Sequence, residues 1–358
     1  MSSLDDLRNQ IDIADQKLVE LLNERARIVV EVGKLKSQNE TDTIYSPSRE
    51  KAVFEKIANA NKGPLPDKTL KAVWRELMSG SFFLERPLRI AYLGPMGSFS
   101  HSAAMLKFGQ SIEYEAVTDI RSIFDEVSKG HSDLGVVPIE NSTGGGIIES
   151  LDALVDSDVL ICAEVHMAIH HNLLANCNLG DIQEVYSKPE IFAQCRNWLS
   201  ATFKETKTIA VASSAKAAQM ASEKPNTAAI GSSAAAELYG LKIVCENIED
   251  IANNVTRFLV ICRIDAKPTG DDKTTLLFST AHKAGALVDV LQIFRDNGLN
   301  LSNIESRPSR KREWEYYFFV DVNGHKDDEV MQKVLSEAKE HCLQLSVLGS
   351  YPKNNSLL

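Results

Sequence analysis

The N-terminal segment, to about Gln38, carries an apolar repeat that is typical of one long helix. Apolar residues recur at alternating spacings of three and four, at Leu4, Leu7, Ile11, Ala14, Leu18, Leu21, Ile28, Val32 and Leu35. Such a heptad pattern predicts a helix with one apolar side that packs against a partner helix. The few helices of this segment cannot bury a large core alone, so we expect a dimer that shares its core.

One residue interrupts this apolar side. Arg25 occupies the position that would complete the series, and a guanidinium group is costly to bury without a partner. Lys36 follows eleven residues later, close to three full turns, so it projects from nearly the same face. Two cations on the inner face of a helical bundle predict a pocket for an anionic small molecule. The alternative is an ion pair across a dimerisation domain.

The composition argues against several classes of protein. A net charge of −10 over 358 residues argues against nucleic acid as a partner. The sequence has no apolar run long enough to span a membrane and no apolar signal core. The six cysteines form no CxxC pair, which fits a reducing cytoplasm better than a disulfide framework. The eight histidines lack metal-ligand spacing, so we interpret them as structural or surface residues.

Three segments with different periodicity predict a multidomain protein. Residues 1–86 show helical periodicity only, with a second helix after Ser46 and a third over about residues 67–84. Residues 87–266 alternate strands and helices, which predicts a two-lobed α/β domain with largely parallel strands. After a polar linker, residues 272–352 show the order βαββαβ of a ferredoxin-like domain.

Four stretches of the helical segment resemble the all-helical chorismate mutase family. They are Leu7-Arg8, Glu24-Arg25, Val32-Gly33-Lys34-Leu35-Lys36 and Arg49-Glu50. The resemblance implies that Arg8, Arg25 and Arg49 bind the two carboxylates of chorismate, for which arginine forks are well suited. Arg8 and Arg25 lie about 25 Å apart along one helix at ~1.5 Å per residue. We therefore expect Arg8 to reach into the site of a partner subunit.

The same resemblance implies the residues that act on the reacting bonds. Lys36 and Glu85 would donate to the ether oxygen of chorismate, and Glu50 would accept from the ring hydroxyl. Glu85 stands where many relatives have glutamine, and Ser46 where many have aspartate. A glutamate donates a proton only in its protonated form, so we expect mutase activity to fall as the pH rises above neutrality.

Three stretches of the second segment resemble prephenate dehydratase: GPMGSFS at residues 94–100, PIENSTGGG at 138–146 and NNVTRF at 253–258. Shorter matches are YSKP at 186–189 and QC at 194–195. The resemblance implies that Thr256 donates a proton to the leaving hydroxyl of prephenate. A threonine is a weak acid, so Arg257, a helix dipole or a bound water must assist.

Other residues of these stretches would line the substrate cleft. By the resemblance they are Glu140, Asn141, Ser187, Gln194 and Arg257. The run Gly144, Gly145 and Gly146 would offer backbone N–H groups to a carboxylate, although it could also serve only as a hinge. Lys188 stands where some relatives have histidine.

The third segment resembles the ACT family of amino-acid sensors. Two motifs carry the resemblance, and their residues are Gly285, Ala286, Leu287 and Val288, then Glu305, Ser306, Arg307 and Pro308. They imply a site for L-phenylalanine at an interface between two such domains, and allosteric inhibition of the dehydratase. The alternative is a domain that only mediates oligomerisation.

Together the resemblances imply a bifunctional chorismate mutase–prephenate dehydratase in the cytoplasm. No metal or organic cofactor is implied, because neither reaction is redox. The alternatives are a monofunctional dehydratase whose helices only dimerise, a non-enzymatic ligand sensor, and an enzyme that prefers arogenate to prephenate. The sequence leaves open whether homodimers pair into tetramers.

Overall fold

The computed structural model describes residues 3–37, 44–204, 206–309 and 315–354. The helical segment forms α1 (Leu4–Ser37), α2 (Pro47–Ala60) and α3 (Asp67–Glu85), as predicted. Ser46 caps α2, because its hydroxyl accepts the backbone N–H of Arg49 at 3.4 Å and Pro47 occupies the first turn. No described helix is both long and apolar enough to cross a membrane.

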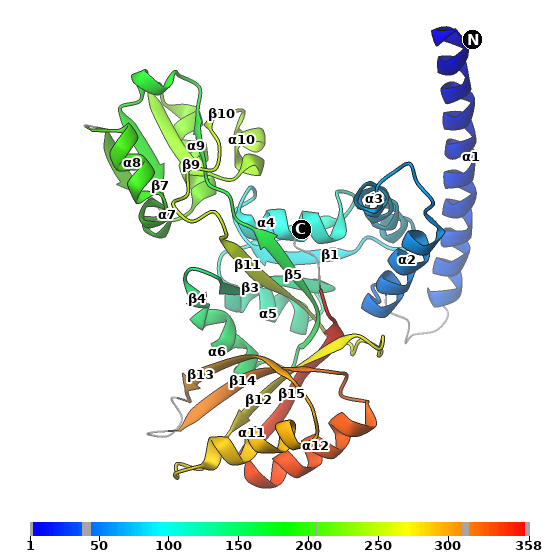
Figure 1. Cartoon of the computed structure of the whole chain (residues 1–358). Helices are drawn as coiled ribbons and strands as arrows, with labels where there is room; N and C mark the ends of the chain where they lie inside the picture. Colours follow the sequence, from blue (N-terminus) through cyan, green and yellow to red (C-terminus); the bar gives the residue numbers. More distant parts are fainter. Residues whose placement is uncertain (1–2, 38–43, 205, 310–314, 355–358) are drawn as a thin grey trace.

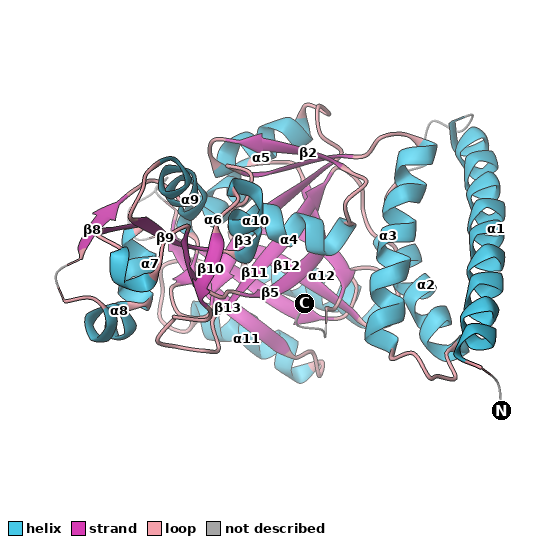
Figure 2. Ribbon diagram, turned by 90° about the horizontal axis from the view of Figure 1, so that it is seen from above, coloured by secondary structure: helices cyan, strands magenta, loops and turns pink. Residues whose placement is uncertain are grey.

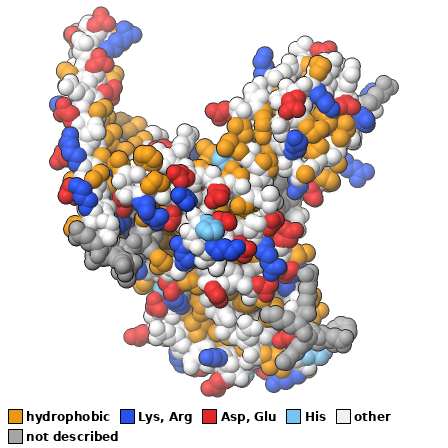
Figure 3. All heavy atoms as spheres, turned by 180° about the vertical axis from the view of Figure 1, so that it is seen from behind, with side chains coloured by type: hydrophobic (Ala, Val, Ile, Leu, Met, Phe, Trp, Pro, Cys, Tyr) orange, Lys and Arg blue, Asp and Glu red, His pale blue; other side chains and the backbone are white. Residues whose placement is uncertain are grey.

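Helix α1 packs on α3 only through its C-terminal part, and its N-terminal part stands apart from the rest of the described chain. Over its described length it contains no buried residue, and its apolar side is open to solvent, with Leu18 55% and Leu21 60% exposed. Its N-terminal part extends beyond α2 and α3 (Figure 1). From behind, this arm is a separate projection from the body of the molecule (Figure 3). Such an exposed apolar stripe needs a partner surface.

Helices α2 and α3, by contrast, are docked on the α/β segment. Ser79 is fully buried, and its hydroxyl accepts the backbone N–H of Ser111 at 3.0 Å. Tyr45, just before α2, packs edge-on against Phe82 of α3 and Phe108 of the next helix, α4 (Phe99–Phe108). Helices α2 and α3 therefore pack directly against the first of the two lobes that the second segment forms.

The first lobe is a mixed sheet in the order β2-β1-β3-β11-β5, with β4 beside β3. Its strands are β1 (Arg89–Leu93), β2 (Glu113–Val117), β3 (Leu134–Asn141), β4 (Gly145–Gly146), β5 (Leu160–Ala168) and β11 (Val255–Cys262). Besides α4, its helices are α5 (Ile120–Ser128) and α6 (Ile148–Asp156). Figure 2 shows α1–α3 at one end of the molecule and the second lobe at the other.

The second lobe is a smaller sheet in the order β10-β6-β9-β7-β8. Its strands are β6 (Asn172–Ala175), β7 (Glu184–Ser187), β8 (Lys207–Ala210), β9 (Thr227–Gly231) and β10 (Lys242–Cys245). Its helices are η1 (Leu179–Asp181), α7 (Pro189–Gln194), α8 (Arg196–Thr202), α9 (Ser214–Glu223) and α10 (Ser233–Tyr239).

The prediction of largely parallel strands is wrong at the centre of the molecule. Strand β11 pairs antiparallel with both β3 and β5, and β6 pairs antiparallel with β9 and β10. The reason is the path of the chain, which leaves the first lobe along β5 and returns along β11. Two strands that cross the same junction in opposite directions must lie antiparallel when they pair.

The third segment has the predicted ferredoxin-like order. Its elements are β12 (Asp272–Ser279), α11 (Ala286–Asp296), β13 (Leu301–Pro308), β14 (Tyr316–Asn323), α12 (Glu329–His341) and β15 (Gln344–Pro352). The antiparallel sheet runs β13-β14-β12-β15, with both helices on the face away from the first lobe (Figure 1). Phe278, Val290 and Phe294 lie in the core between sheet and helices.

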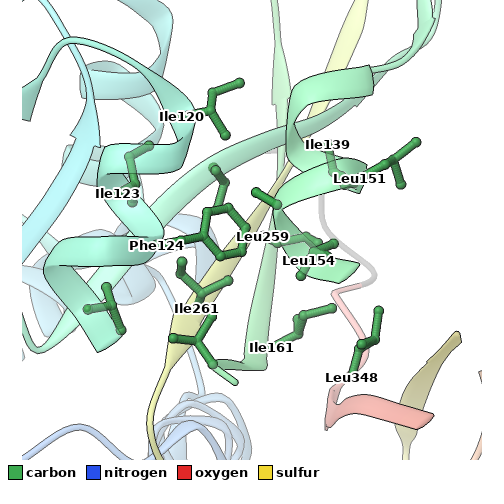
Figure 4. Close-up of a cluster of buried hydrophobic side chains, with 14 of the residues drawn as sticks. Ile120, Ile123, Phe124, Ile139, Leu151, Leu154, Ile161, Leu259, Ile261 and Leu348 are labelled. Atoms are coloured by element: carbon green, nitrogen blue, oxygen red, sulfur yellow. The ribbon is translucent and has the colours of Figure 1, made fainter. Parts of the chain in front are cut away.

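The other face of this sheet shares a hydrophobic core with the first lobe. One buried cluster joins Ile161 and Leu259 of the first lobe to Leu348 and Phe319 of the third segment. Figure 4 shows Leu348 beside Ile161 at the edge of this cluster. The third segment is thus part of the body of the protein. Separating it from the first lobe would expose a buried apolar face, which is unfavourable.

We expect Gly349→Ala to loosen this packing. A Cβ atom at Gly349 would overlap the backbone of Ile161 on β5, and backbone cannot move aside cheaply. Overpacking of this kind costs about 1–3 kcal/mol, so the melting temperature measured by calorimetry should fall. Gly80→Ala is the control, because a Cβ there meets nothing within 4 Å and alanine favours helix α3. Equal melting of the two variants would contradict the predicted close approach.

Candidate active sites

A cluster of polar side chains lies where the two lobes meet. Asn141, at the end of β3, donates from its amide nitrogen to Thr256 Oγ1 at 2.8 Å and to Asn254 Oδ1 at 2.8 Å. Thr256 and Asn254 are buried, while Asn141 is partly exposed. The pairing of β3 with β11 brings these residues together, because Thr256 is the register partner of Asn141.

The orientation of the Asn141 amide is determined by its other contacts. Its Oδ1 accepts the backbone N–H groups of Thr143 and Gly144, each at 3.0 Å, and the Thr143 hydroxyl at 2.6 Å. Backbone N–H groups can only donate, so the amide nitrogen must face Thr256. Thr256 Oγ1 therefore accepts from Asn141, and its own proton is free to be donated.

Gln194, at the end of α7, connects the second lobe to this cluster. Its Nε2 donates to Thr143 Oγ1 at 3.1 Å, and its Oε1 lies 3.5 Å from Asn254 Nδ2. The sequence-predicted residues Asn141, Gln194 and Thr256 are thus brought together in one hydrogen-bonded network across the lobe junction.

Arg257 lies on the opposite face of β11 from Thr256. Its guanidinium group donates to Glu164 at 2.9 Å and to the Tyr351 hydroxyl at 3.0 Å, and pairs with Asp321 at 2.7 Å. Glu140 is the register partner of Arg257, 4.0 Å from it, and lies on that same face. Successive residues of a strand point to opposite faces, so neither side chain joins the cluster around Thr256.

The other residues considered for the cleft are Ser187, the glycine run at 144–146 and Lys188, and each already has contacts within the protein. The Ser187 hydroxyl is fully buried and donates to the carbonyl of Ile230 at 2.9 Å, between strands of the second lobe. Gly144 already donates its N–H to Asn141 Oδ1, and Gly145 and Gly146 pair with the end of β3. Lys188 lies 3.9 Å from Glu190 at the start of α7.

Glu164 is a deeply buried charge in the contact between the first lobe and the third segment. Its side chain is 1% exposed and accepts both Arg257 and Lys273, the latter at 3.0 Å. Burial alone would raise the pKa of Glu164. The hydrogen bond from His166 and the charges of Arg257 and Lys273 outweigh burial and lower that pKa well below its usual range.

The second candidate site lies between α1 and α3. Arg25 donates to the buried Ser81 hydroxyl at 2.7 Å, and Lys36 pairs with Glu85 at 3.0 Å. Glu85 is the more enclosed of that pair, with 12% of its side chain exposed. The structure therefore brings Arg25 and Lys36 of α1 against one face of α3.

The remaining predicted residues of this site are farther apart. Arg8, on the projecting part of α1, makes an exposed ion pair with Asp5 at 3.5 Å. Arg49 is exposed on the first turn of α2. Glu50 accepts the Tyr45 hydroxyl at 2.8 Å and pairs at 2.6 Å with Lys107, which belongs to α4 of the first lobe.

The two motifs of the third segment contribute to different surfaces. Gly285, with φ +83°, precedes α11, and residues 285–288 line a cavity of about 190 Å³ together with Tyr316 and Phe318. Ser306 and Pro308 are the register partners of Phe318 and Tyr316. The alternating residues face the first lobe: Arg307 pairs with Asp152 at 2.8 Å, and the Glu305 carboxylate approaches Gly146.

Comparison with known proteins agrees with this arrangement. Family profiles match in order for Chorismate mutase type II over residues 7–86, Prephenate dehydratase over 90–266 and ACT domain over 274–340. The Bifunctional chorismate mutase/prephenate dehydratase of Aquifex aeolicus (strain VF5) is 43% identical over 99% of both chains. The chain belongs to this family.

Two solved structures cover about three quarters of this family member. A prephenate dehydratase from Arthrobacter aurescens in complex with L-Phe is 31% identical over 74% of this chain and 90% of its own, with a TM-score of 0.69. A protein described as GqqA, a novel type of quorum quenching acylase, is 27% identical over 75% of this chain and 98% of its own, with a TM-score of 0.69.

Sequence reasoning missed three residues that complete the two sites of this chorismate mutase/prephenate dehydratase. Thr143 and Asn254 lie within the stretches that carried the resemblance, next to residues that were singled out. Ser81 lies four residues before Glu85, one helical turn away on the same face of α3. That spacing was the available signal for Ser81.

We expect Glu164→Gln to destabilise the protein in a pH-dependent way. Removing one charge from a buried pair costs about 3–5 kcal/mol. Because the pKa of Glu164 is lowered on folding, its contribution is complete above the unfolded value of about 4.5 and is lost as the pH falls through the folded value. The melting temperature of the variant should therefore be lower at neutral pH, and the difference should shrink in acid.

Glu113→Gln is the control for this experiment, because Glu113 is 56% exposed and pairs with Arg89 at the surface. Its melting temperature should match wild type at neutral pH. A Glu164→Gln variant as stable as the control would contradict the importance of the buried network.

Proposed function

We propose that the protein rearranges chorismate to prephenate in the helical site and converts prephenate to phenylpyruvate at the lobe junction. We further propose that L-phenylalanine inhibits the dehydratase through the ACT domain. The observation that carries the dehydratase assignment is the Asn141 amide, which donates to Thr256 Oγ1 at 2.8 Å and leaves the threonine proton free.

In the proposed dehydratase reaction, Thr256 donates that proton to the ring hydroxyl of prephenate, which leaves as water. The ring carboxylate leaves as CO2, and its bonding electrons enter the ring, which becomes aromatic. Aromatisation provides the driving force, so a weak acid that is well positioned can suffice. Asn141 would position the Thr256 hydroxyl, because both of its amide N–H groups are engaged by Thr256 and Asn254, and Gln194 would help to orient the substrate at the lobe junction.

The proposed mutase site needs two copies of the chain. Arg25 and Lys36 of α1 lie against one face of α3, and Arg8 lies far along the exposed arm of α1. In a homodimer joined through the apolar side of α1, Arg8 would complete the site of the partner subunit. Arg49 and Glu50 would join the substrate from α2, which requires Glu50 to leave Lys107.

The regulatory proposal rests on the position of the ACT motifs. The cavity beside Gly285 is lined by the aromatic rings of Tyr316 and Phe318, which suits the side chain of phenylalanine. Strand β13 carries Arg307 and Glu305 on its other face, against α6 and Gly146. A ligand that shifts β13 would therefore act on the loop beside Asn141. The related dehydratase from Arthrobacter aurescens was solved with L-Phe.

Product analysis of purified protein supplied with chorismate tests the whole proposal. Wild type should form phenylpyruvate, and phenylalanine should suppress it. Thr256→Val should accumulate prephenate, with dehydratase kcat lowered by about 100- to 10,000-fold, because the proton donor is lost while the shape is kept. Thr256→Ser should retain much of the activity. A fully active Thr256→Val would contradict the role of this hydroxyl.

The same assay separates the alternatives. Arg25→Ala should abolish chorismate turnover and leave conversion of added prephenate intact, whereas a monofunctional dehydratase would show no effect of the substitution on catalysis. A ligand sensor would turn over neither substrate. Arogenate offered in competition with prephenate tests substrate preference. The cytoplasmic location and the homodimer stay predictions.

We expect Glu85→Gln to change the pH dependence of the mutase if Glu85 acts as the proton donor that the resemblance implies. A glutamine amide donates at every pH and releases Lys36 from its 3.0 Å ion pair, whereas glutamate must be protonated to donate. Wild-type kcat/KM for chorismate should then fall as the pH rises, and the profile of the variant should be flatter. Glu31→Gln, at an exposed pair with Lys34, is the control. Identical profiles would show that Glu85 has been misassigned.

A further inference from the structure

We propose that His171 is a positioning residue of the dehydratase, which fixes the amide of Gln194 and through it the cluster around Thr256. The inference rests on the proposed dehydratase function and goes beyond it, because His171 belongs to none of the motifs that carried that proposal. Sequence reasoning interpreted this histidine as structural or surface.

His171 lies on the first connection between the lobes, directly before β6. It is 1% exposed, and its ring packs edge-on against Phe99, with the centroids 5.5 Å apart. Its backbone is fixed on both sides, because its N–H donates to Glu249 at 2.9 Å and its carbonyl accepts the N–H of Ile248 at 2.8 Å. The ring is therefore held at the lobe junction by groups outside the polar cluster.

The imidazole makes one polar contact among the described residues. Its Nε2 lies 2.6 Å from Gln194 Oε1, an atom that also faces Asn254 Nδ2. A carbonyl oxygen can only accept, so the proton of the neutral ring is on Nε2. Burial lowers the pKa of His171, while the bond to Gln194 and the charge of Glu249 oppose that shift. The net lowering favours the neutral ring.

The other ring nitrogen argues for a functional role. Nδ1 is buried and has no hydrogen-bond partner in the described part of the chain. A buried polar atom without a partner destabilises a protein, and an apolar side chain of similar shape would avoid that cost. Stability alone therefore does not explain a histidine at this position, whereas its Nε2–H group can hold an amide oxygen in place.

The bond from His171 begins a continuous chain of donors that ends at Thr256. His171 donates to Gln194, which donates to Thr143 at 3.1 Å; Thr143 donates to Asn141 at 2.6 Å, and Asn141 donates to Thr256 at 2.8 Å. If the Gln194 amide were reversed, its oxygen would draw the Thr143 proton away from Asn141. His171 with its proton on Nε2 opposes this reversal, because its N–H would then face the N–H groups of Gln194, and Asn254 Nδ2, which faces the same oxygen, acts in the same direction.

The test is dehydratase kinetics of three variants, with mutase activity of the same sample as an internal measure of folding. His171→Phe keeps the ring and removes the donor, so kcat for prephenate should fall about 10- to 100-fold with KM changed less than about threefold. His171→Gln restores an N–H near the position of Nε2 and should recover most of kcat. His170→Gln, at the neighbouring half-exposed histidine, should match wild type.

A double-mutant cycle makes the test specific for the proposed route. In a Gln194→Leu background, His171→Phe should cause no further loss, because the amide that it positions is absent. The melting temperature of His171→Phe should equal or exceed that of wild type, which a purely structural role would not produce.

Three results would overturn the inference: wild-type kcat in His171→Phe, no recovery in His171→Gln, or additive losses in the cycle. If His171→Phe does not fold, the dehydratase activities of His171→Gln and His171→Asn are compared instead. The shorter amide of asparagine cannot reach Gln194, so the His171→Asn variant should stay inactive. Nitrogen NMR of labelled histidine must also show the proton on Nε2. Wild-type protein that converts no prephenate would instead overturn the proposed function.

Discussion

The pairing of β11 with β3 on one side and β5 on the other is the interaction on which both the proposed dehydratase site and the contact with the ACT sheet depend. Because side chains alternate along a strand, Thr256 faces the lobe junction and Arg257 faces the ACT sheet. A one-residue slip of this register would exchange the two and destroy both contacts. The shared core around Leu259 and Ile261 stabilises the register.

The contact between the first lobe and the ACT sheet is unusually rich in buried charge. Glu164, Arg257, Lys273 and Asp321 form a connected network, and Thr275 joins it through bonds to Asp321 at 2.6 Å and Tyr351 at 2.7 Å. Such a network tolerates only a few arrangements, because each unpaired member would carry a large desolvation cost. The network therefore fixes the ACT sheet relative to the strand that carries Thr256, as the proposed regulation requires.

The helices of the N-terminal segment differ in what they pack against. Helices α2 and α3 bury their contacts against the first lobe, as Ser79 and Tyr45 illustrate, while α1 keeps a long apolar side exposed. Burial of that side by a second copy would stabilise the dimer and place Arg8 near a site that it cannot reach within its own chain. Glu50 joins this segment to the first lobe through Lys107, so the proposed mutase site is in physical contact with the lobe that carries Thr256.

The local pattern of the sequence predicted the elements and much of the chemistry of the candidate sites. The heptad repeat predicted α1, Ser46 marked the start of α2, and the βαββαβ order of the ACT domain is confirmed. These features depend on residues close together in the chain, where periodicity and capping act directly. The resemblance to known families also placed Asn141, Gln194 and Thr256 in one site before their contacts were known.

Only the tertiary structure decided the contacts between residues that are far apart in the sequence. Four such features have no local signature in the sequence. They are the antiparallel return of β11, the direction of Arg257, the bond from Glu50 to Lys107 and the bond from His171 to Gln194. Each depends on register and on which faces of distant elements meet, and that is set by packing of the whole chain. The sequence by itself determined which groups are available, and the fold decided which of them meet.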